Sequence, residues 1–113
     1  MKILSVSLDA ELAALRHAIL AADGHEVSTV TAETEAVKAA ESSMHYEVVL
    51  VCHRFPSAAS RRVIRLLREH HPSTRIVHIV HVYGEWPEIE ADRYIVGADG
   101  PAALLQVLRE VHV

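Results

Sequence analysis

The sequence predicts a single α/β domain in which strands and helices alternate. Five short runs of apolar or β-branched residues are separated by stretches whose apolar residues recur at helical spacing. Half of the 113 residues are apolar and 23% are charged, which is typical of a folded domain. A chain of this length has room for one domain. Such alternation implies a parallel sheet with helices on both faces.

The first two strands are each followed by a helix. Residues 2–7 predict a strand, and Asp9 then caps a helix that Gly24 ends. This helix is expected to bury one apolar stripe, made of Leu8, Leu12, Leu15, Ile19 and Ala22. The β-branched residues 26–30 predict a second strand, and the Ala- and Glu-rich residues 32–42 predict a second helix.

The second half of the chain continues the same pattern. Residues 47–52 form a nearly continuous apolar run, as expected of a central strand that is buried on both faces. A third helix lies between Pro56 and Pro72, and residues 75–80 and 93–96 predict two more strands. Pro101 suits the first turn of a last helix. Right-handed crossovers then favour a flavodoxin-like doubly wound sheet with strand order 2-1-3-4-5.

The composition excludes several classes of protein. A single cysteine excludes a disulfide scaffold and a paired Cys/His zinc motif. The apolar run at 48–52 is too short to cross a membrane, and Lys2 leads directly into a strand and not into a signal peptide. We find no glycine-rich phosphate loop and no nucleophile motif. A cytoplasmic protein that is not an enzyme and needs no cofactor is therefore expected.

Several stretches resemble the receiver domains of bacterial response regulators. Residues 46–56 read YEVVLVCHRFP, which is similar to the third strand, the phospho-acceptor position and the following loop of that family. Residues 70–80 (HHPSTRIVHIV) and 91–96 (ADRYIV) are similar to the passages into its fourth and fifth strands. The resemblance extends over essentially the whole chain. It implies signalling in a two-component system or phosphorelay, with a protein partner.

The same resemblance marks positions at which the family's chemistry is missing. The family uses two acidic residues to hold Mg²⁺, an aspartate to accept phosphate, a switch hydroxyl and a lysine. The positions that align with them are Ser7 and Leu8 (with Asp9 beside them), Cys52, Val80 and Gly97. Mg²⁺ requires carboxylate oxygens, and a thiol cannot form the acyl phosphate. The sequence therefore predicts a pseudo-receiver, which keeps the fold without phosphotransfer.

The segment between the last two strands is short. Residues 81–92 suffice for a parallel crossover but leave no length for the family's fourth helix, which we expect to be shortened or absent. An apolar surface formed by Trp86, Ile89 and Tyr94 with the last helix would then bind a sensor kinase, another regulator or a second copy as a homodimer. The alternative is that Trp86 simply covers the gap.

Positive charge is concentrated on the third helix. Arg61, Arg65 and Arg68 share one face at helical spacing, with Arg62 beside them. The net charge of −4 and the scarcity of aromatic residues argue against nucleic acid as the partner. This basic face is expected to be solvated or to meet an acidic protein surface.

The corner at the end of the third strand allows a second hypothesis. Cys52, His53 and His81 are expected near the carboxyl ends of neighbouring strands, where this fold binds ligands. These residue types suit Zn²⁺ or a reactive thiolate, so a ligand, metal or redox sensor is the alternative function. Otherwise Cys52 is a small buried apolar residue.

Overall fold

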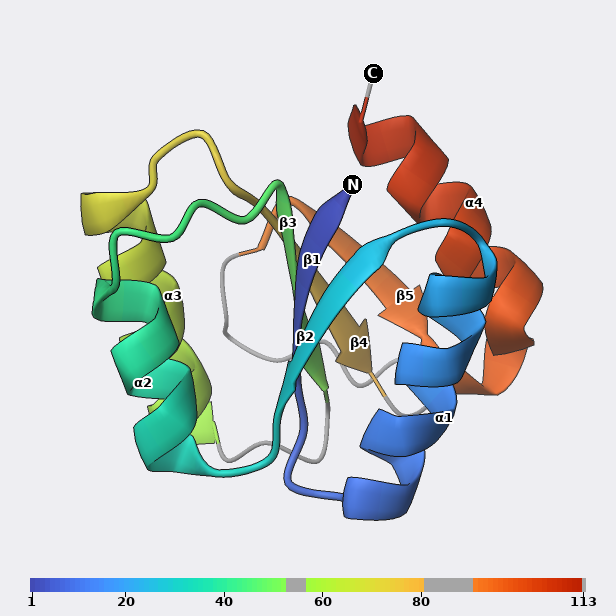
Figure 1. Ribbon diagram of the computed structural model, residues 1–113, viewed down its shortest axis with the longest axis horizontal. Coiled ribbons are helices and arrows are strands. Elements are labelled where there is room, and N and C mark those ends of the chain that lie inside the picture. The colour runs from blue at the N-terminus through green and yellow to red at the C-terminus, as the bar shows by residue number, and fades with distance from the viewer. Residues whose placement is uncertain (53–56, 81–90, 113) are drawn as a thin grey trace.

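Five parallel strands form one sheet in the order β2-β1-β3-β4-β5, which confirms the flavodoxin-like prediction (Figure 1). The computed structural model describes residues 1–52, 57–80 and 91–112. The strands are β1 (Lys2–Val6), β2 (Glu26–Val30), β3 (Val48–Cys52), β4 (Arg75–Val80) and β5 (Arg93–Val96). The helices are α1 (Ala10–Ala22), α2 (Glu33–Glu41), α3 (Ser57–His70) and α4 (Gly100–His112), with a 3₁₀ turn η1 (Gly97–Asp99) before α4.

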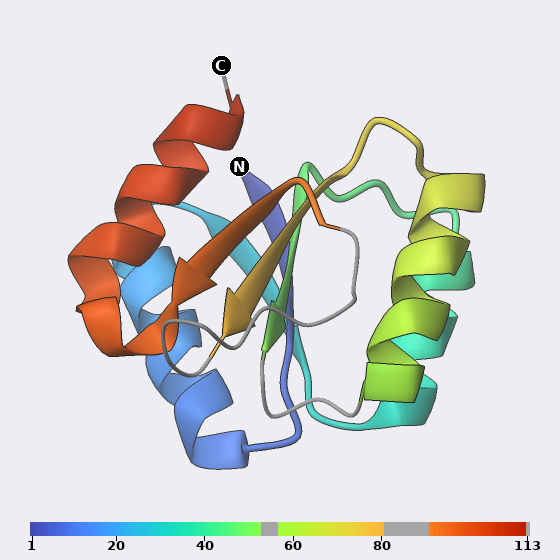
Figure 2. The ribbon, with the colours of Figure 1, turned by 180° about the vertical axis from the view of Figure 1, so that it is seen from behind.

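The helices are divided between the two faces of the sheet. Figures 1 and 2 show α2 and α3 together on one face and α1 and α4 on the other. Helix α1 begins as predicted, because the Asp9 carboxylate accepts a hydrogen bond from the Leu12 backbone N–H at 3.1 Å. It ends at Gly24, whose φ of +88° is a left-handed conformation that favours glycine.

Two apolar cores lie on the two faces, and β3 contributes to both. The core under α2 and α3 includes Val49, Val63 and Leu67, whereas the core under α1 and α4 includes Leu20 and Leu50. Every residue of β3 is buried, as the apolar run predicts. The central strand thus holds the two layers together.

The predicted inward stripe of α1 is wrong. The buried residues of this helix are Ala13, Arg16 and Leu20. By contrast, Leu15 is 57% exposed and Leu8, which precedes the helix, is 42% exposed. The small side chain of Ala13 allows α1 to lie close to the strands, so the helix presents this face to the sheet and turns its leucine stripe sideways. The stripe therefore faces the side where α4 lies.

The register brings the predicted site positions to one edge of the sheet. All four strand pairings are parallel, and near their carboxyl ends Cys52 pairs with Ile79 and Val80 pairs with Val96. The shortened fourth helix was predicted within residues 81–92, most of which lie outside the described residues. Among the helices that are described, none is both long and apolar enough to cross a membrane.

Candidate functional site

The loop after β1 uses its polar groups within the loop itself. The Ser7 side chain is fully buried, and its Oγ accepts a hydrogen bond from the Asp9 backbone N–H at 3.2 Å. The same hydroxyl donates to the Asp9 carbonyl at 3.4 Å. Since the Asp9 carboxylate already caps α1, this loop is organised to start a helix. The Leu8 side chain has no polar atom that could bind a metal ion, and it is 42% exposed.

The three other aligned positions, Cys52, Val80 and Gly97, are apolar or lack a side chain. Cys52 is 1% exposed and Val80 is 2% exposed, so both belong to the core. A Cβ atom at Gly97 would lie 3.5 Å from the Val80 carbonyl oxygen and 4.0 Å from Nη2 of Arg16. None of the positions aligned with the receiver family's site carries a carboxylate, and Asp9 lies beside two of them.

The predicted metal or thiol corner is only partly described. His53 and His81 lie outside the described residues. Within the described ranges, no group of three or more His, Cys, Asp or Glu side chains is placed to hold a metal ion. The burial of Cys52 is that of a small apolar core residue and not of an accessible nucleophile.

Arg16 is the residue that sequence reasoning missed. It lies on the sheet side of α1 and is 8% exposed. Within the part of the chain that the structure describes, its Nη1 atom has no hydrogen-bond partner. A signal was present, because Leu12, Arg16 and Leu20 are spaced by four residues and therefore share one face of the helix. The spacing of Leu8, Leu12 and Leu15 instead predicted a different buried face.

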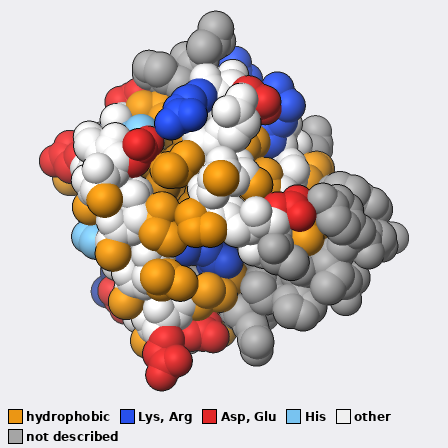
Figure 3. All heavy atoms as spheres, turned by 90° about the vertical axis from the view of Figure 1, so that its right-hand side faces the viewer, with side chains coloured by type: hydrophobic (Ala, Val, Ile, Leu, Met, Phe, Trp, Pro, Cys, Tyr) orange, Lys and Arg blue, Asp and Glu red, His pale blue; other side chains and the backbone are white. Residues whose placement is uncertain are grey.

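Arg16 faces a hollow of about 100 Å³ between α1 and α4. Leu12, Leu15 and Ile19 of α1 form one side of the hollow. The other lining residues are Ile79, Ile95, Val96, Gly97, Gly100, Pro101 and Leu104. Figure 3 looks onto this face and shows hydrophobic side chains gathered around basic side-chain atoms. The leucine stripe of α1 therefore lines a site with one cationic group.

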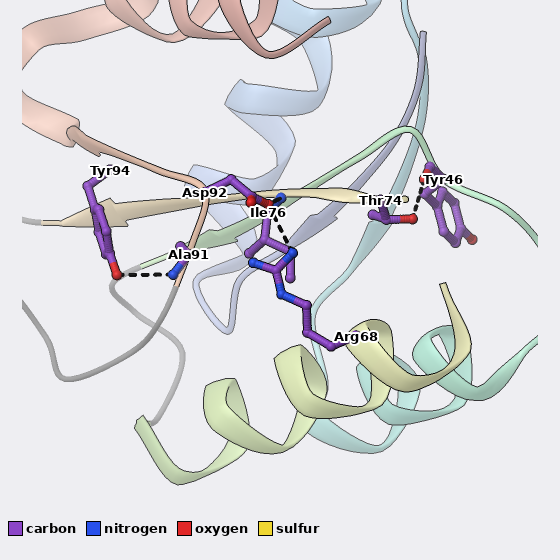
Figure 4. A network of polar contacts seen from close by, with 7 residues as sticks. All are labelled: Tyr46, Arg68, Thr74, Ile76, Ala91, Asp92 and Tyr94. Atoms are coloured by element: carbon purple, nitrogen blue, oxygen red, sulfur yellow. Dashed lines mark hydrogen bonds and ion pairs between the residues drawn. The ribbon is translucent and has the colours of Figure 1, made fainter. Parts of the chain in front are cut away.

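The proposed partner surface around Tyr94 is described in part. Trp86 and Ile89 lie outside the described residues. The Tyr94 hydroxyl accepts a hydrogen bond from the Ala91 backbone N–H at 3.0 Å (Figure 4). Its ring is tilted against that of the buried His78, with centroids 6.1 Å apart. Tyr94 thus contacts His78 of β4 and the Ala91 backbone just before β5, and it remains partly exposed.

The four arginines of the basic face of α3 differ in their surroundings. Arg61, Arg62 and Arg65 are exposed, as expected. Arg68 instead donates to the Asp92 carboxylate at 3.2 Å, and the same oxygen accepts the Ile76 backbone N–H at 2.7 Å (Figure 4). Arg68 therefore links α3 to Asp92, the residue just before β5. This leaves the other three arginines as the exposed part of the face.

Solved receiver domains share this fold over nearly the whole chain. The receiver domain of a sensor histidine kinase from Pseudomonas aeruginosa, solved with magnesium coordinated in its active-site cleft, is 19% identical, with a TM-score of 0.85 and coverage of 99% of this chain and 98% of that one. Chemotaxis protein CheY4 of Vibrio cholerae is 21% identical, with a TM-score of 0.82 and coverage of 97% of each chain. The response regulator TrrA of Thermotoga maritima, in complex with Mg²⁺ and BeF, is 20% identical with a TM-score of 0.81 and the same coverage.

These comparisons establish the fold of the chain. No family model and no curated protein matches the sequence. The chain therefore has the response-regulator receiver fold, also called CheY-like.

Proposed function

We propose that this chain is a pseudo-receiver in two-component signalling, which acts by binding another protein and does not accept phosphate. The fold supports the signalling context, since solved structures of receiver domains share it. The observation that carries the proposal is the edge at which those domains hold magnesium. Here it presents Ser7, Leu8, Cys52, Val80 and Gly97.

The chemistry of this edge opposes phosphotransfer. Mg²⁺ prefers several carboxylate oxygens in near-octahedral geometry. The aligned positions carry no carboxylate, and the carboxylate of the adjacent Asp9 accepts a hydrogen bond from the Leu12 backbone N–H. At the ends of β3 and β4, Val80 offers no polar group, and the thiol of Cys52 is buried and cannot form the acyl phosphate that an aspartate forms. The chain is accordingly proposed to be a binding protein and not an enzyme.

Two surfaces are proposed for the partner. One contains Trp86, Ile89 and Tyr94, and the other is the exposed basic face of Arg61, Arg62 and Arg65. The partner would be a sensor kinase, another regulator or a second copy of this chain. Charged groups on a surface steer association, so an acidic partner suits the basic face.

Phosphorylation is tested by incubating the protein with phosphoramidate and MgCl₂ and recording its intact mass. We expect no increase by one phosphoryl group, while CheY4 of Vibrio cholerae, treated in parallel as a positive control, is expected to gain one. A Cys52→Ala variant identifies modification of the thiol. An adduct on wild type that survives in Cys52→Ala and disappears in Asp9→Asn would overturn the proposal.

Partner binding is tested by capture of the tagged chain from lysate of its source cells, read by mass spectrometry. We expect a two-component protein to be enriched and to be lost with either Trp86→Ala/Ile89→Ala or Arg62→Glu/Arg65→Glu. The variant that loses it identifies the surface. Equal enrichment with wild type and both double variants would contradict both surfaces.

A further inference from the structure

We propose that the hollow between α1 and α4 is a binding site for a small carboxylic acid with an apolar body, held through the guanidinium of Arg16. The proposal goes beyond protein binding and does not depend on it. Two independent features of the site support it, the charge at its floor and the shape and character of its walls.

The first feature is a buried charge that meets no acidic side chain among the described residues around it. An arginine side chain keeps its positive charge in proteins, and burying a charge is unfavourable unless it is paired. Arg16 is 8% exposed, and no acidic side chain is among the described residues that line the hollow. Within the described residues, Nη1 has no hydrogen-bond partner. Arg16 lines the hollow, so an anion that enters it would pair with the guanidinium.

The second feature is the apolar wall. Leu12, Leu15 and Ile19 form the most hydrophobic stripe of α1, and they line the hollow with Leu104 of α4 on the opposite side. Helices α1 and α4 hardly touch each other, whereas α2 and α3 pack together. Leu15 is consequently 57% exposed. Such a site, apolar with a single polar anchor, is typical of small-molecule recognition.

The chemistry of the walls selects the class of anion. A planar carboxylate matches the guanidinium with two parallel hydrogen bonds. A phosphate dianion would keep a charge and oxygens that one guanidinium does not neutralise, because the other described side chains that line the hollow are apolar. An enclosed apolar cavity of about 150 Å³ holds a benzene ring. This hollow of about 100 Å³ is smaller but open beside the exposed Leu15, so it suits one partly enclosed ring or a short branched chain. Benzoate is therefore a suitable probe.

Gly97 contributes by having no side chain. A Cβ atom at this position would lie 4.0 Å from Nη2 of Arg16, so longer side chains would stand over the guanidinium. The residue therefore leaves room for a ligand beside the cation. A protein carboxylate is the competing occupant, and it is disfavoured because the hollow is too small to admit a helix or a strand.

The experiment is a titration of the isotope-labelled wild-type chain with benzoate, followed by ¹H–¹⁵N NMR. We expect saturable shifts in α1, η1 and the start of α4. Benzamide has the same shape without the charge, and it is expected to bind at least about tenfold more weakly because a charged hydrogen bond is lost. Equal affinity for the two probes would overturn the role of Arg16. Absence of saturation with benzoate would overturn the site.

Variants locate the binding on the chain. Arg16→Met removes the charge with little change in length and should abolish saturable benzoate binding. The matched control is Arg109→Met, which makes the same change at an exposed arginine of α4 and should bind like wild type. Retained binding in Arg16→Met would refute the proposal. If Arg16→Met does not fold, the wild-type comparison of benzoate with benzamide still decides. Loss of a captured protein partner in Arg16→Met without benzoate binding to wild type would assign the hollow to a protein carboxylate.

Discussion

Helices α2 and α3 pack against each other over one face of the sheet, whereas α1 and α4 cover the other face and hardly touch. The side chains under α2 and α3 are almost all aliphatic or alanine, and they form one continuous cluster. On the opposite face, α1 directs an arginine to the sheet and turns its leucines into the space beside α4. One face of the sheet is thus covered by closely packed helices. The other face has a hollow between its helices, and Arg16 lines that hollow.

If the hollow is the proposed binding site, one face of the sheet serves stability and the other serves binding. Close packing of apolar groups stabilises a fold, while a buried charge without a partner destabilises it. Functional sites commonly retain groups that reduce stability. We therefore expect substitutions on the two faces to change stability in different directions.

The largest effect is expected from Leu67→Ala under α3. Leu67 is 1% exposed in the cluster under α2 and α3, so its truncation should lower the free energy of unfolding by about 2–5 kcal/mol. Leu15→Ala is the matched change on the other face, and it should alter this free energy by less than about 0.5 kcal/mol because Leu15 is mostly exposed. Urea denaturation of both variants measures the difference. Equal losses would show that the two faces are packed alike.

The second effect has the opposite sign. Arg16→Met should raise the free energy of unfolding by about 1–3 kcal/mol, because it replaces a buried charge with an apolar chain of similar length. Arg109→Met, at an exposed site, should leave it within about 0.5 kcal/mol of wild type. The midpoint of urea denaturation gives both values. A destabilised Arg16→Met protein would mean that the guanidinium is already stabilised in the folded chain.

The third effect concerns the bond between α3 and β5. Asp92→Ala should lower the free energy of unfolding by about 1–3 kcal/mol, since it removes the acceptor of the Ile76 backbone N–H. Arg68→Met should cost less than about 1 kcal/mol, because the Arg68 side chain is 37% exposed. A double-mutant cycle by chemical denaturation separates the two contributions. A coupling energy as large as the whole Asp92 effect would attribute it to the ion pair.

The smallest change in stability is expected at Asp9, which caps the start of α1. Asp9→Ala should lower the free energy of unfolding by about 1 kcal/mol through loss of the helix cap. Addition of MgCl₂ should change the stability of wild type and variant equally. A Mg²⁺-dependent gain in melting temperature that is confined to wild type would reveal Asp9 as a metal ligand. That result would weaken the pseudo-receiver proposal.

Much of the fold was predictable because short-range patterns decide it. The strands at 26–30, 75–80 and 93–96 match the sequence reading residue for residue. The orientation of α1 was not predictable in the same way, because its two candidate faces differ by a small rotation. The leucine spacing favoured one face, and close packing of Ala13 against the sheet favoured the other. Tertiary packing decided between them.

The candidate site was predictable only where a resemblance indicated it. Ser7, Cys52, Val80 and Gly97 lie at or just beyond the carboxyl ends of their strands, as the alignment to receiver domains implies. Arg16 was missed because an arginine in a helix is normally counted as exposed. Its burial depends on how far α4 stands from α1, and no pattern within α1 encodes that distance.

The strand order also has a consequence for how fast the chain folds. Strand β1 is synthesised first but lies between β2 and β3, so Ile3 must pair with Val27 on one side and Val48 on the other. Each pairing closes a long loop, and the entropy lost in closing it opposes the pairing. Proteins dominated by such distant contacts fold more slowly than helical bundles of the same length. Of the two pairings of β1, the one with β2 closes the shorter loop, which contains α1. We therefore expect β1, α1 and β2 to form first and the rest of the sheet to add to them.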